Sequence, residues 1–167
     1  PPARLRARGR GGAVFAAAVL GCLFLAGCGF RPLYGGGKLA PQLAAIYVEP
    51  VAERDGYELR NQLIDLLHSD GSQAGKKYIL KVSLNEASQG IALRNDATIT
   101  RYNQTLDVHY VLSDAHGTQL TEGDQTSISS YNVVTSPYAT LAASQDSSKR
   151  AAQDIAERIH LDLGAYF

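Results

Sequence analysis

Side chains alternate in character from Tyr102 to Leu112, and this pattern constrains the fold more than any other feature of the sequence. Successive side chains of a strand point to opposite sides of a sheet, so the alternation predicts a long strand with one buried face. The turn sequence Asp114-Ala115-His116-Gly117 follows, and residues 119–132 are predicted to form the hairpin partner, which is polar at nearly every position. Tyr78 to Glu86 alternates in the same way and predicts a further half-buried strand.

Two segments have the spacing of amphipathic helices. Asp55 with Glu58 is similar to a capping box, and a leucine stripe follows until Ser69-Asp70-Gly71 ends the first helix. Ser136 and Pro137 are the predicted N-cap and first-turn proline of the second helix. The buried stripe of the second helix is expected to contain Ala152, Ile155, Ile159, Leu163 and Tyr166. Its exposed face is expected to carry two i,i+4 ion pairs, Asp146 with Arg150 and Asp154 with Arg158.

The remaining elements complete the order of the fold. Ala45 to Glu49 predicts a short strand ended by Pro50, and Gly90 to Ala97 predicts a strand end followed by a turn. The element order is therefore β-α-β-β-β-α. We predict a single small α+β domain over residues 44–167, in which two helices pack on one face of a four-stranded mixed sheet.

The N-terminal residues have the three parts of a secretory signal: a basic end, an apolar run and small residues before a cysteine. The 14 residues from Ala13 to Ala26 carry no charge, but a spanning helix needs roughly 20 residues. Leu25-Ala26-Gly27-Cys28 resembles the lipobox of bacterial lipoproteins, whose cysteine is acylated after cleavage. We therefore expect residues 1–27 to be a cleaved lipoprotein signal peptide. Residues 28–43 would then be a lipidated N-terminus and flexible tether.

The expected lipid on Cys28 is a diacylglycerol with an additional N-acyl chain such as palmitate, and no other cofactor is implied. Each buried methylene contributes about 0.8 kcal/mol, so two or three chains anchor a protein durably. Two plainer interpretations of the leader remain. It is either a signal peptide that ends near a cysteine by chance or a single membrane helix.

Charge and cysteine content exclude several classes of function. The chain has 16 Lys and Arg against 16 Asp and Glu, but the leader contributes four arginines and no acid, which leaves a net −4 on residues 28–167. This balance argues against a nucleic-acid partner. Cys28 is the only cysteine after the leader, and the four histidines lack zinc-type spacing. No nucleophile motif occurs either, so we expect no metal site and no enzymatic activity.

The second half of the chain is rich in tyrosine and uncharged polar residues. Between Ala97 and Asn132 the charged residues are Arg101, Asp107, Asp114, Glu122 and Asp124. Tyrosine with neutral hydrogen-bonding side chains is typical of buried polar interfaces. An ordinary Ser- and Thr-rich solvent face explains the composition equally well.

Arg94 and Arg101 are the candidate binding residues. They flank the predicted turn Asn95-Asp96-Ala97-Thr98, so a strand-end loop could present both guanidinium groups to one anion. Two guanidinium groups suit a phosphate, which they bind bidentately. Alternatively, they are solvated turn residues or pair with Asp96.

Several stretches carry a resemblance to a known family. Cys28-Gly29-Phe30-Arg31-Pro32-Leu33-Tyr34-Gly35 resembles the start of the LptE family, the lipopolysaccharide-assembly lipoproteins of Gram-negative bacteria. The resemblance spans essentially all residues after the leader and respects the predicted element order. Its later parts are Leu93–Asp96 with Thr100–Tyr102, Ser130–Asn132 with Ser136–Ala139, and Lys149–Ala152.

The resemblance implies a non-enzymatic lipoprotein that plugs the outer-membrane barrel LptD and helps to assemble it for lipopolysaccharide transport to the cell surface. It implies an anchor in the inner leaflet of the outer membrane, on the periplasmic side. Gly29 agrees, because an aspartate after the cysteine would resemble an inner-membrane retention signal.

The resemblance also implies lipopolysaccharide binding. Arg94 matches a basic residue of the family's turn, although some relatives have a further basic residue where this chain has Tyr138 to Ala143. The polar surface between Tyr102 and Asn132 is the expected barrel-facing surface. The alternatives are a periplasmic auxiliary lipoprotein of a lipid ABC transporter and, with less support, a periplasmic hydrolase or glycan binder.

Overall fold

The computed structural model describes residues 39–93, 95 and 98–167, all within one compact unit. Cys28, Arg94 and the leader lie outside the described residues. The elements in chain order are helix α2 (Leu39–Ala44), strand β1 (Ile46–Val48), helix α3 (Glu53–Leu67), strands β2 (Tyr78–Leu93), β3 (Ile99–Asp114) and β4 (Gln119–Asn132), and helix α4 (Pro137–Tyr166).

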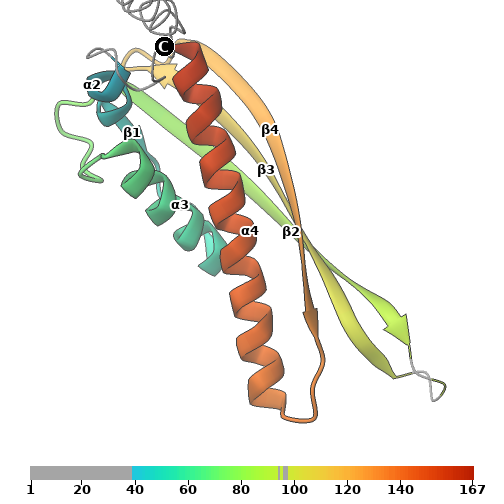
Figure 1. The fold of residues 1–167 in the computed structure, drawn as a ribbon. Helices are drawn as coiled ribbons and strands as arrows, with labels where there is room; N and C mark the ends of the chain where they lie inside the picture. The colour runs from blue at the N-terminus through green and yellow to red at the C-terminus, as the bar shows by residue number, and fades with distance from the viewer. Residues whose placement is uncertain (1–38, 94, 96–97) are drawn as a thin grey trace, which may run out of the picture. The chain divides into compact units, whose positions relative to one another are not determined.

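The four strands form one mixed sheet in the order β1-β2-β3-β4. β1 pairs with β2 in parallel over three residues, and β2, β3 and β4 form an antiparallel meander. Helices α3 and α4 lie across one face of this sheet (Figure 1). The predicted α+β domain, with two helices on one face of a four-stranded mixed sheet, is confirmed.

The core lies between the helices and the covered face of the sheet. Leu80 of β2 pairs with Leu112 of β3, and neither side chain is exposed to solvent. Buried side chains recur at every second residue of β3 from Gln104 to Leu112, which confirms the predicted alternation. The helices contribute a fully buried set that consists of Leu59, Leu63, Ala152, Ile155, Ala156, Ile159 and Leu163.

The two long helices differ from the prediction at their ends. Helix α3 begins at Glu53 and its N-cap, Ala52, makes no side-chain hydrogen bond, so the capping box assigned to Asp55 is wrong. The structure confirms Ser136 as N-cap of α4, where its side chain accepts a hydrogen bond from Ala139 N. Tyr166 was wrongly placed in the buried stripe, because it is 45% exposed.

Strand β2 is longer than predicted, because it continues past Glu86 to Leu93. The extension contains register shifts against β3 between Gly90 and Ala92 and between Ala92 and Leu93. A Cβ atom on Gly90 would lie 2.8 Å from Ile99 Cδ1, so this position suits a residue without a side chain. The sequence analysis did not predict helix α2, which lies at the end of the segment expected to be a tether.

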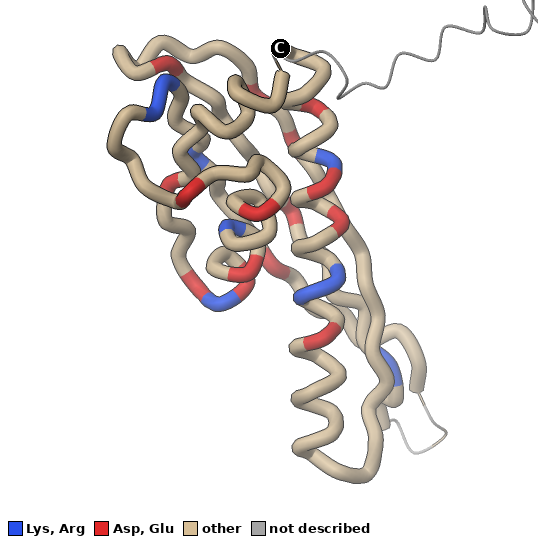
Figure 2. The backbone as a smooth tube through the Cα atoms, turned by 60° about the vertical axis from the view of Figure 1, so that its left-hand side comes forward, with Lys and Arg blue, Asp and Glu red and all other residues tan. Residues whose placement is uncertain are grey.

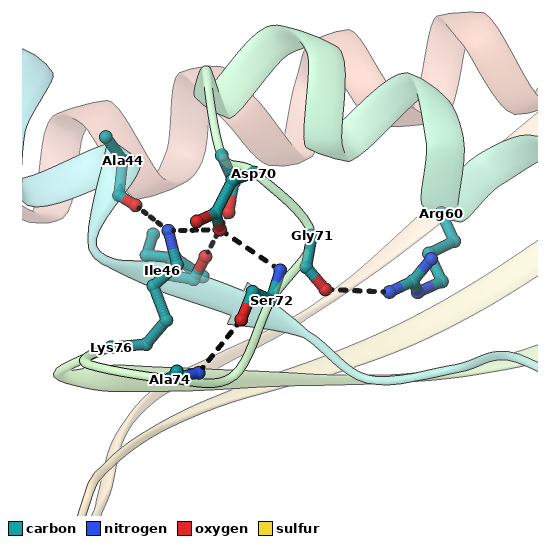
Figure 3. Close-up of polar contacts among 9 residues, drawn as sticks. Ala44, Ile46, Arg60, Asp70, Gly71, Ser72, Ala74 and Lys76 are labelled. Carbon is teal, nitrogen blue, oxygen red and sulfur yellow. Dashed lines mark hydrogen bonds and ion pairs between the residues drawn. The ribbon is translucent and has the colours of Figure 1, made fainter.

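Two cations hold the loop between α3 and β2 (Figure 3). Lys76 Nζ lies 2.9 Å from Asp70 Oδ1 and donates to the Ala44 carbonyl at 2.8 Å. The hydrogen bond from Lys76 lowers the pKa of the Asp70 carboxyl. Arg60 donates to the carbonyls of Val48 and Gly71 at 3.1 and 3.4 Å. Arg60 and Lys76 therefore have structural partners.

Within residues 39–93, 95 and 98–167, no helix combines the length and the apolarity required to cross a bilayer.

Candidate functional site

The candidate site lies at one end of the long strands β2, β3 and β4, away from the end at which β1 pairs with β2. We call this end the distal end. It comprises residues 87–93 and 99–103 of the β2–β3 hairpin, residues 128–132 of β4 and residues 133–145. Figure 1 shows the β2–β3 hairpin and the start of α4 extending to this end, beyond the first turn of α3. We call the remainder of the described unit the body.

The distal end is almost free of charge. No charged residue occurs between Asp124 and Asp146, and residues 87–93 contain none. Figure 2 shows the acidic and basic residues concentrated over the body. Among the described residues of the distal end, Arg101 carries the only charge.

The same end exposes large apolar side chains. Leu93 is 69% exposed and Tyr138 is 81% exposed, which is unusual for groups of this size. The other exposed large apolar residues of the distal end are Ile91, Ile128, Val134 and Leu141. Only Tyr57, Leu161 and Tyr166 are comparable in the described part of the body. Six of the nine exposed large apolar residues in the described part of the chain therefore lie in the distal end, which makes this end a candidate for contact with a protein or a lipid.

Arg101 lies at the start of β3, between Ala92 of β2 and Asn132 of β4 in the sheet register. Its side chain is exposed and has no ion pair or hydrogen bond with another described residue. Arg94, its predicted companion on one anion, lies outside the described residues, as does Asp96. The structure therefore places one of the two candidate arginines in the set of alternate β3 residues that faces away from the helices, near the end of β2 that carries the exposed Leu93.

The loop that joins β4 to α4 is fixed to the helix by one side chain. Thr140 Oγ1 accepts a hydrogen bond from Val134 N at 3.1 Å and lies 3.2 Å from the carbonyl oxygens of Val134 and Ser136. At the neighbouring strand ends, Val133 N donates to Thr100 O at 2.9 Å. These bonds connect the start of α4 to the strands that carry Arg101.

The polar surface predicted between Tyr102 and Asn132 is divided between two faces. On the open face, Asp107, His109 and Asp124 are exposed, and His109 Nδ1 lies 2.8 Å from Asp124 Oδ1. The other set of alternate residues faces the helices. No group of three or more metal-ligating side chains gathers anywhere in the described part of the chain.

The helix-facing set forms a polar seam between β4 and α4, which the sequence analysis missed. Ser127 Oγ donates to Asp154 at 2.7 Å, and Gln125 Nε2 donates to Asp162 at 2.7 Å. Ser129 Oγ donates to the carbonyl of Ser147 at 2.9 Å. The sequence did contain a signal for this seam. Gln125, Ser127 and Ser129 are polar and stand at every second position, which puts them on one face of β4. Part of the neutral polar composition is therefore an interface within the chain.

The chain is similar to a known family and to several known proteins. Residues 43–163 match the LptE family, described as lipopolysaccharide-assembly. An uncharacterized protein of Rickettsia prowazekii, RP188, is 28% identical over 148 residues, which are 87% of this chain and 92% of that protein.

Solved structures share the fold. A candidate lipoprotein from Caulobacter crescentus superposes with a TM-score of 0.65 at 28% identity, over 78% of this chain and 96% of the other. A minor lipoprotein from Acinetobacter baumannii gives a TM-score of 0.58 at 16% identity, over 73% and 92% of the two chains. The rare lipoprotein B from Shewanella oneidensis gives 0.53 at 10% identity, over 72% and 93%.

Proposed function

Because this chain belongs to the LptE family of lipopolysaccharide-assembly proteins, we propose that it is a non-enzymatic lipoprotein of the outer membrane that plugs the LptD barrel and helps to assemble it. A diacylglycerol and an N-acyl chain on Cys28 anchor it in the inner leaflet, on the periplasmic side. In this position it serves the transport of lipopolysaccharide to the cell surface.

The open face of the sheet is the surface that we assign to the barrel wall. Large barrels have polar interiors, and this face presents mostly hydrogen-bonding side chains, such as Asn103, Thr105 and Thr126, beside the exposed Ile128. Helix α4 is a poorer match, because Asp146 pairs with Arg150 within the helix and Asp154 is bonded to Arg158 and to Ser127 of β4.

The distal end is the part that we assign to lipopolysaccharide. An exposed arginine without a partner among the described residues is suited to a phosphate of lipid A. The exposed side chains of Ile91 and Leu93, at the end of the neighbouring strand β2, are suited to its acyl chains. We propose Arg94, which directly follows Leu93 in the sequence, as a second residue that binds the phosphate. Among the described residues of the distal end, Arg101 is the only charge and lies near exposed apolar side chains of β2, and this observation carries the assignment.

Co-purification with the barrel tests the plug. Mild-detergent extraction of the tagged protein should recover a large outer-membrane barrel. Cys28→Ala should give a folded protein that leaves the membrane fraction and recovers much less barrel, because the anchor is lost. Equal membrane retention of this variant would contradict the anchor. Recovery of inner-membrane transport proteins alone would favour the ABC-transporter alternative.

Titration with lipopolysaccharide tests the distal end. Arg101→Glu should weaken binding about tenfold, which corresponds to roughly 1.4 kcal/mol. Lys149→Glu makes the same change of charge on the exposed side of α4 in the body and should leave the affinity unchanged. If the two variants bound with equal affinity and had unchanged circular dichroism, Arg101 would be a solvated residue that does not contribute to lipopolysaccharide binding.

A further inference from the structure

Strand β4 forms one edge of the sheet, since it is last in the order β1-β2-β3-β4. In an antiparallel pair, alternate residues direct their main-chain N–H and C=O groups toward the neighbouring strand and away from it. Val133 N donates to Thr100 O, and the β3–β4 register has no shift in the distal end. The odd-numbered residues of β4 therefore bond to β3, and the outward main-chain groups at this end belong to Ile128, Ser130 and Asn132.

In the body, charged side chains protect the same edge. Arg158 of α4 donates to the carbonyl of Thr126 at 3.3 Å, which agrees with the outward direction of the even-numbered residues. The guanidinium group is held there by hydrogen bonds to Asp154 at 2.9 and 3.2 Å. Glu122 and Asp124 add two exposed charges farther along the strand. Charges of this kind keep an edge strand from pairing with other chains.

The distal part of the β4 edge lacks this protection. Residues 125–136 contain no charged residue and no proline. No hydrogen bond from another described residue reaches the outward main-chain groups of Ile128, Ser130 or Asn132. Main-chain donors and acceptors of a strand remain available here to a partner.

The opposite edge of the sheet is protected in a different way. Strand β1 pairs with β2 only as far as Leu80, so the rest of β2 has a free outer side. This part of β2 carries the charge of Glu86, and its register against β3 shifts twice between Gly90 and Leu93. Charges and bulges both disfavour pairing at an edge. The distal edge of β4 is therefore the more suitable of the two for an additional strand.

The chemistry of this edge selects an extended polypeptide. Its outward N–H and C=O groups recur at every second residue, about 7 Å apart, and this spacing matches the main chain of another strand. A second copy of the chain, paired through residues 128–132 alone, would bury much less than the roughly 1,000 Å² that a stable interface needs. The added strand must therefore belong to a partner that also binds elsewhere.

The open face of the sheet is continuous with this edge. Ile128 and Ser130 lie opposite Thr105 and Asn103 of β3, so their side chains are on the face that we assign to the barrel wall. Ser130 Oγ donates to Asn103 Oδ1 at 2.7 Å across this face. A partner that covers the open face thus reaches the distal edge without a gap.

We propose that the distal edge of β4 pairs with an extended, uncharged segment of the barrel protein, which adds a fifth strand to the four-stranded sheet. The inference rests on the proposed function and specifies part of its interface. The strands of a closed barrel have no free edges, so the segment comes from a loop or a terminal extension rather than from the wall. Arg158 confines the added strand to the distal end.

Hydrogen exchange read at single residues tests the pairing in the anchored protein, alone in detergent and in the purified complex with the barrel. The amides of Ile128, Ser130 and Asn132 should exchange at least about tenfold more slowly in the complex, the factor expected from one net hydrogen bond. The Glu122 amide also points outward but lies in the body, so its exchange should stay unchanged.

Two outcomes of this measurement would overturn the proposal. If the three distal amides exchanged equally fast in both samples, the edge would remain hydrated in the complex. If they were already protected in the protein alone, and more so at higher protein concentration, a second copy of the chain would be the occupant.

A main-chain substitution provides an independent test. Ser130→Pro removes an outward N–H and leaves the bonds to β3 in place, as proline is tolerated on an edge strand when its nitrogen faces solvent. Ser130→Ala is the matched control, because it loses the hydroxyl bond to Asn103 but keeps the N–H. Each variant is co-expressed with a differently tagged wild-type chain, and the ratio of the two is measured in the purified barrel.

Ser130→Pro should be about tenfold under-represented in the barrel, whereas Ser130→Ala should compete equally. Equal representation of both variants would overturn the added strand. If Ser130→Pro did not fold, as judged by circular dichroism, hydrogen exchange of the wild type would decide. Failure to recover any barrel would overturn the plug role and this inference with it, whereas recovered barrel with unprotected distal amides would overturn the inference alone.

Discussion

Helix α4 passes through two different environments, and the contrast separates what the chain needs for folding from what it offers to partners. In the body, Ile155, Ile159 and Leu163 are fully buried against the sheet and α3. In the distal end, Tyr138 and Leu141 of the same helix are exposed. The two sets are similarly apolar. The apolar residues in the C-terminal half of this helix therefore belong to the core, whereas those in its N-terminal half remain available to a partner.

The strands repeat this contrast. In the body, Leu80 and Leu112 form a fully buried cross-strand pair. Toward the distal end, Tyr102 and Tyr131 occupy the same side of the sheet and stack with ring centroids 5.5 Å apart, but both are only partly buried. Stability should therefore be concentrated in the body.

Truncation of matched residues on α4 should give the largest difference between the two regions. Ile155→Ala removes a fully buried side chain and should reduce the free energy of unfolding by about 2–5 kcal/mol. Leu141→Ala removes an exposed side chain and should change it by less than about 0.5 kcal/mol. Urea unfolding followed by circular dichroism measures both. Similar losses would mean that the distal end is packed as tightly as the body.

Substitution of glycine should give the next largest difference. In the body, a Cβ on Gly123 would lie 2.6 Å from the Tyr110 hydroxyl, which donates to Asp162 at 2.9 Å. Burial and this bond raise the pKa of Tyr110 to about 12. Gly123→Ala must displace the ring and should destabilise by about 1–3 kcal/mol.

The distal counterpart is Gly90→Ala, whose Cβ would meet the side chain of Ile99. Ile99 is only partly buried and can move, so we expect a loss below about 1 kcal/mol. Thermal unfolding of the two variants side by side measures the difference. If Gly90→Ala proved the more damaging, the distal hairpin would be the more rigid of the two regions.

Removal of an exposed ion pair should have the smallest effect. Asp146 and Arg150 form an i,i+4 pair at the boundary between the two halves of α4, and both side chains are more than half exposed. Asp146→Asn should change the free energy of unfolding by less than about 0.5 kcal/mol, and added salt should reduce the difference further. A salt-independent loss of several kcal/mol in urea unfolding would assign this pair a structural role.

The sequence predicted the elements whose burial follows a simple period. Strand β3 was anticipated because its buried residues recur at every second position. The C-terminal half of α4 was anticipated because its buried residues recur at every third or fourth position. The start of α3 was misassigned because Asp55 and Glu58 have the spacing of a capping box, whereas the helix begins two residues earlier, after an N-cap residue, Ala52, that makes no side-chain bond. The extension of β2 lacks alternation, since its distal residues have no helix to cover them.

The candidate site was anticipated in part. Arg101 could be selected from the sequence as a strand-end cation, and the structure adds the exposed apolar side chains found elsewhere in the distal end. These exposed side chains could not be predicted, because residues such as Leu141 and Tyr138 resemble core residues until the length of the covered sheet is known. The polar seam was missed because serines that form hydrogen bonds to a helix cannot be distinguished in the sequence from serines that face solvent.

The attachment of the α4 start through Thr140 has a consequence for how the chain tolerates mutation. The loop and the first turn of the helix are held mainly by hydrogen bonds to main-chain groups, which do not depend on the identity of neighbouring side chains. Apart from Thr140 and the N-cap residue Ser136, residues of this segment can therefore be exchanged with little effect on folding. A saturation library across residues 133–145 that keeps these two residues, selected in living cells, would show which side chains a partner of this segment requires.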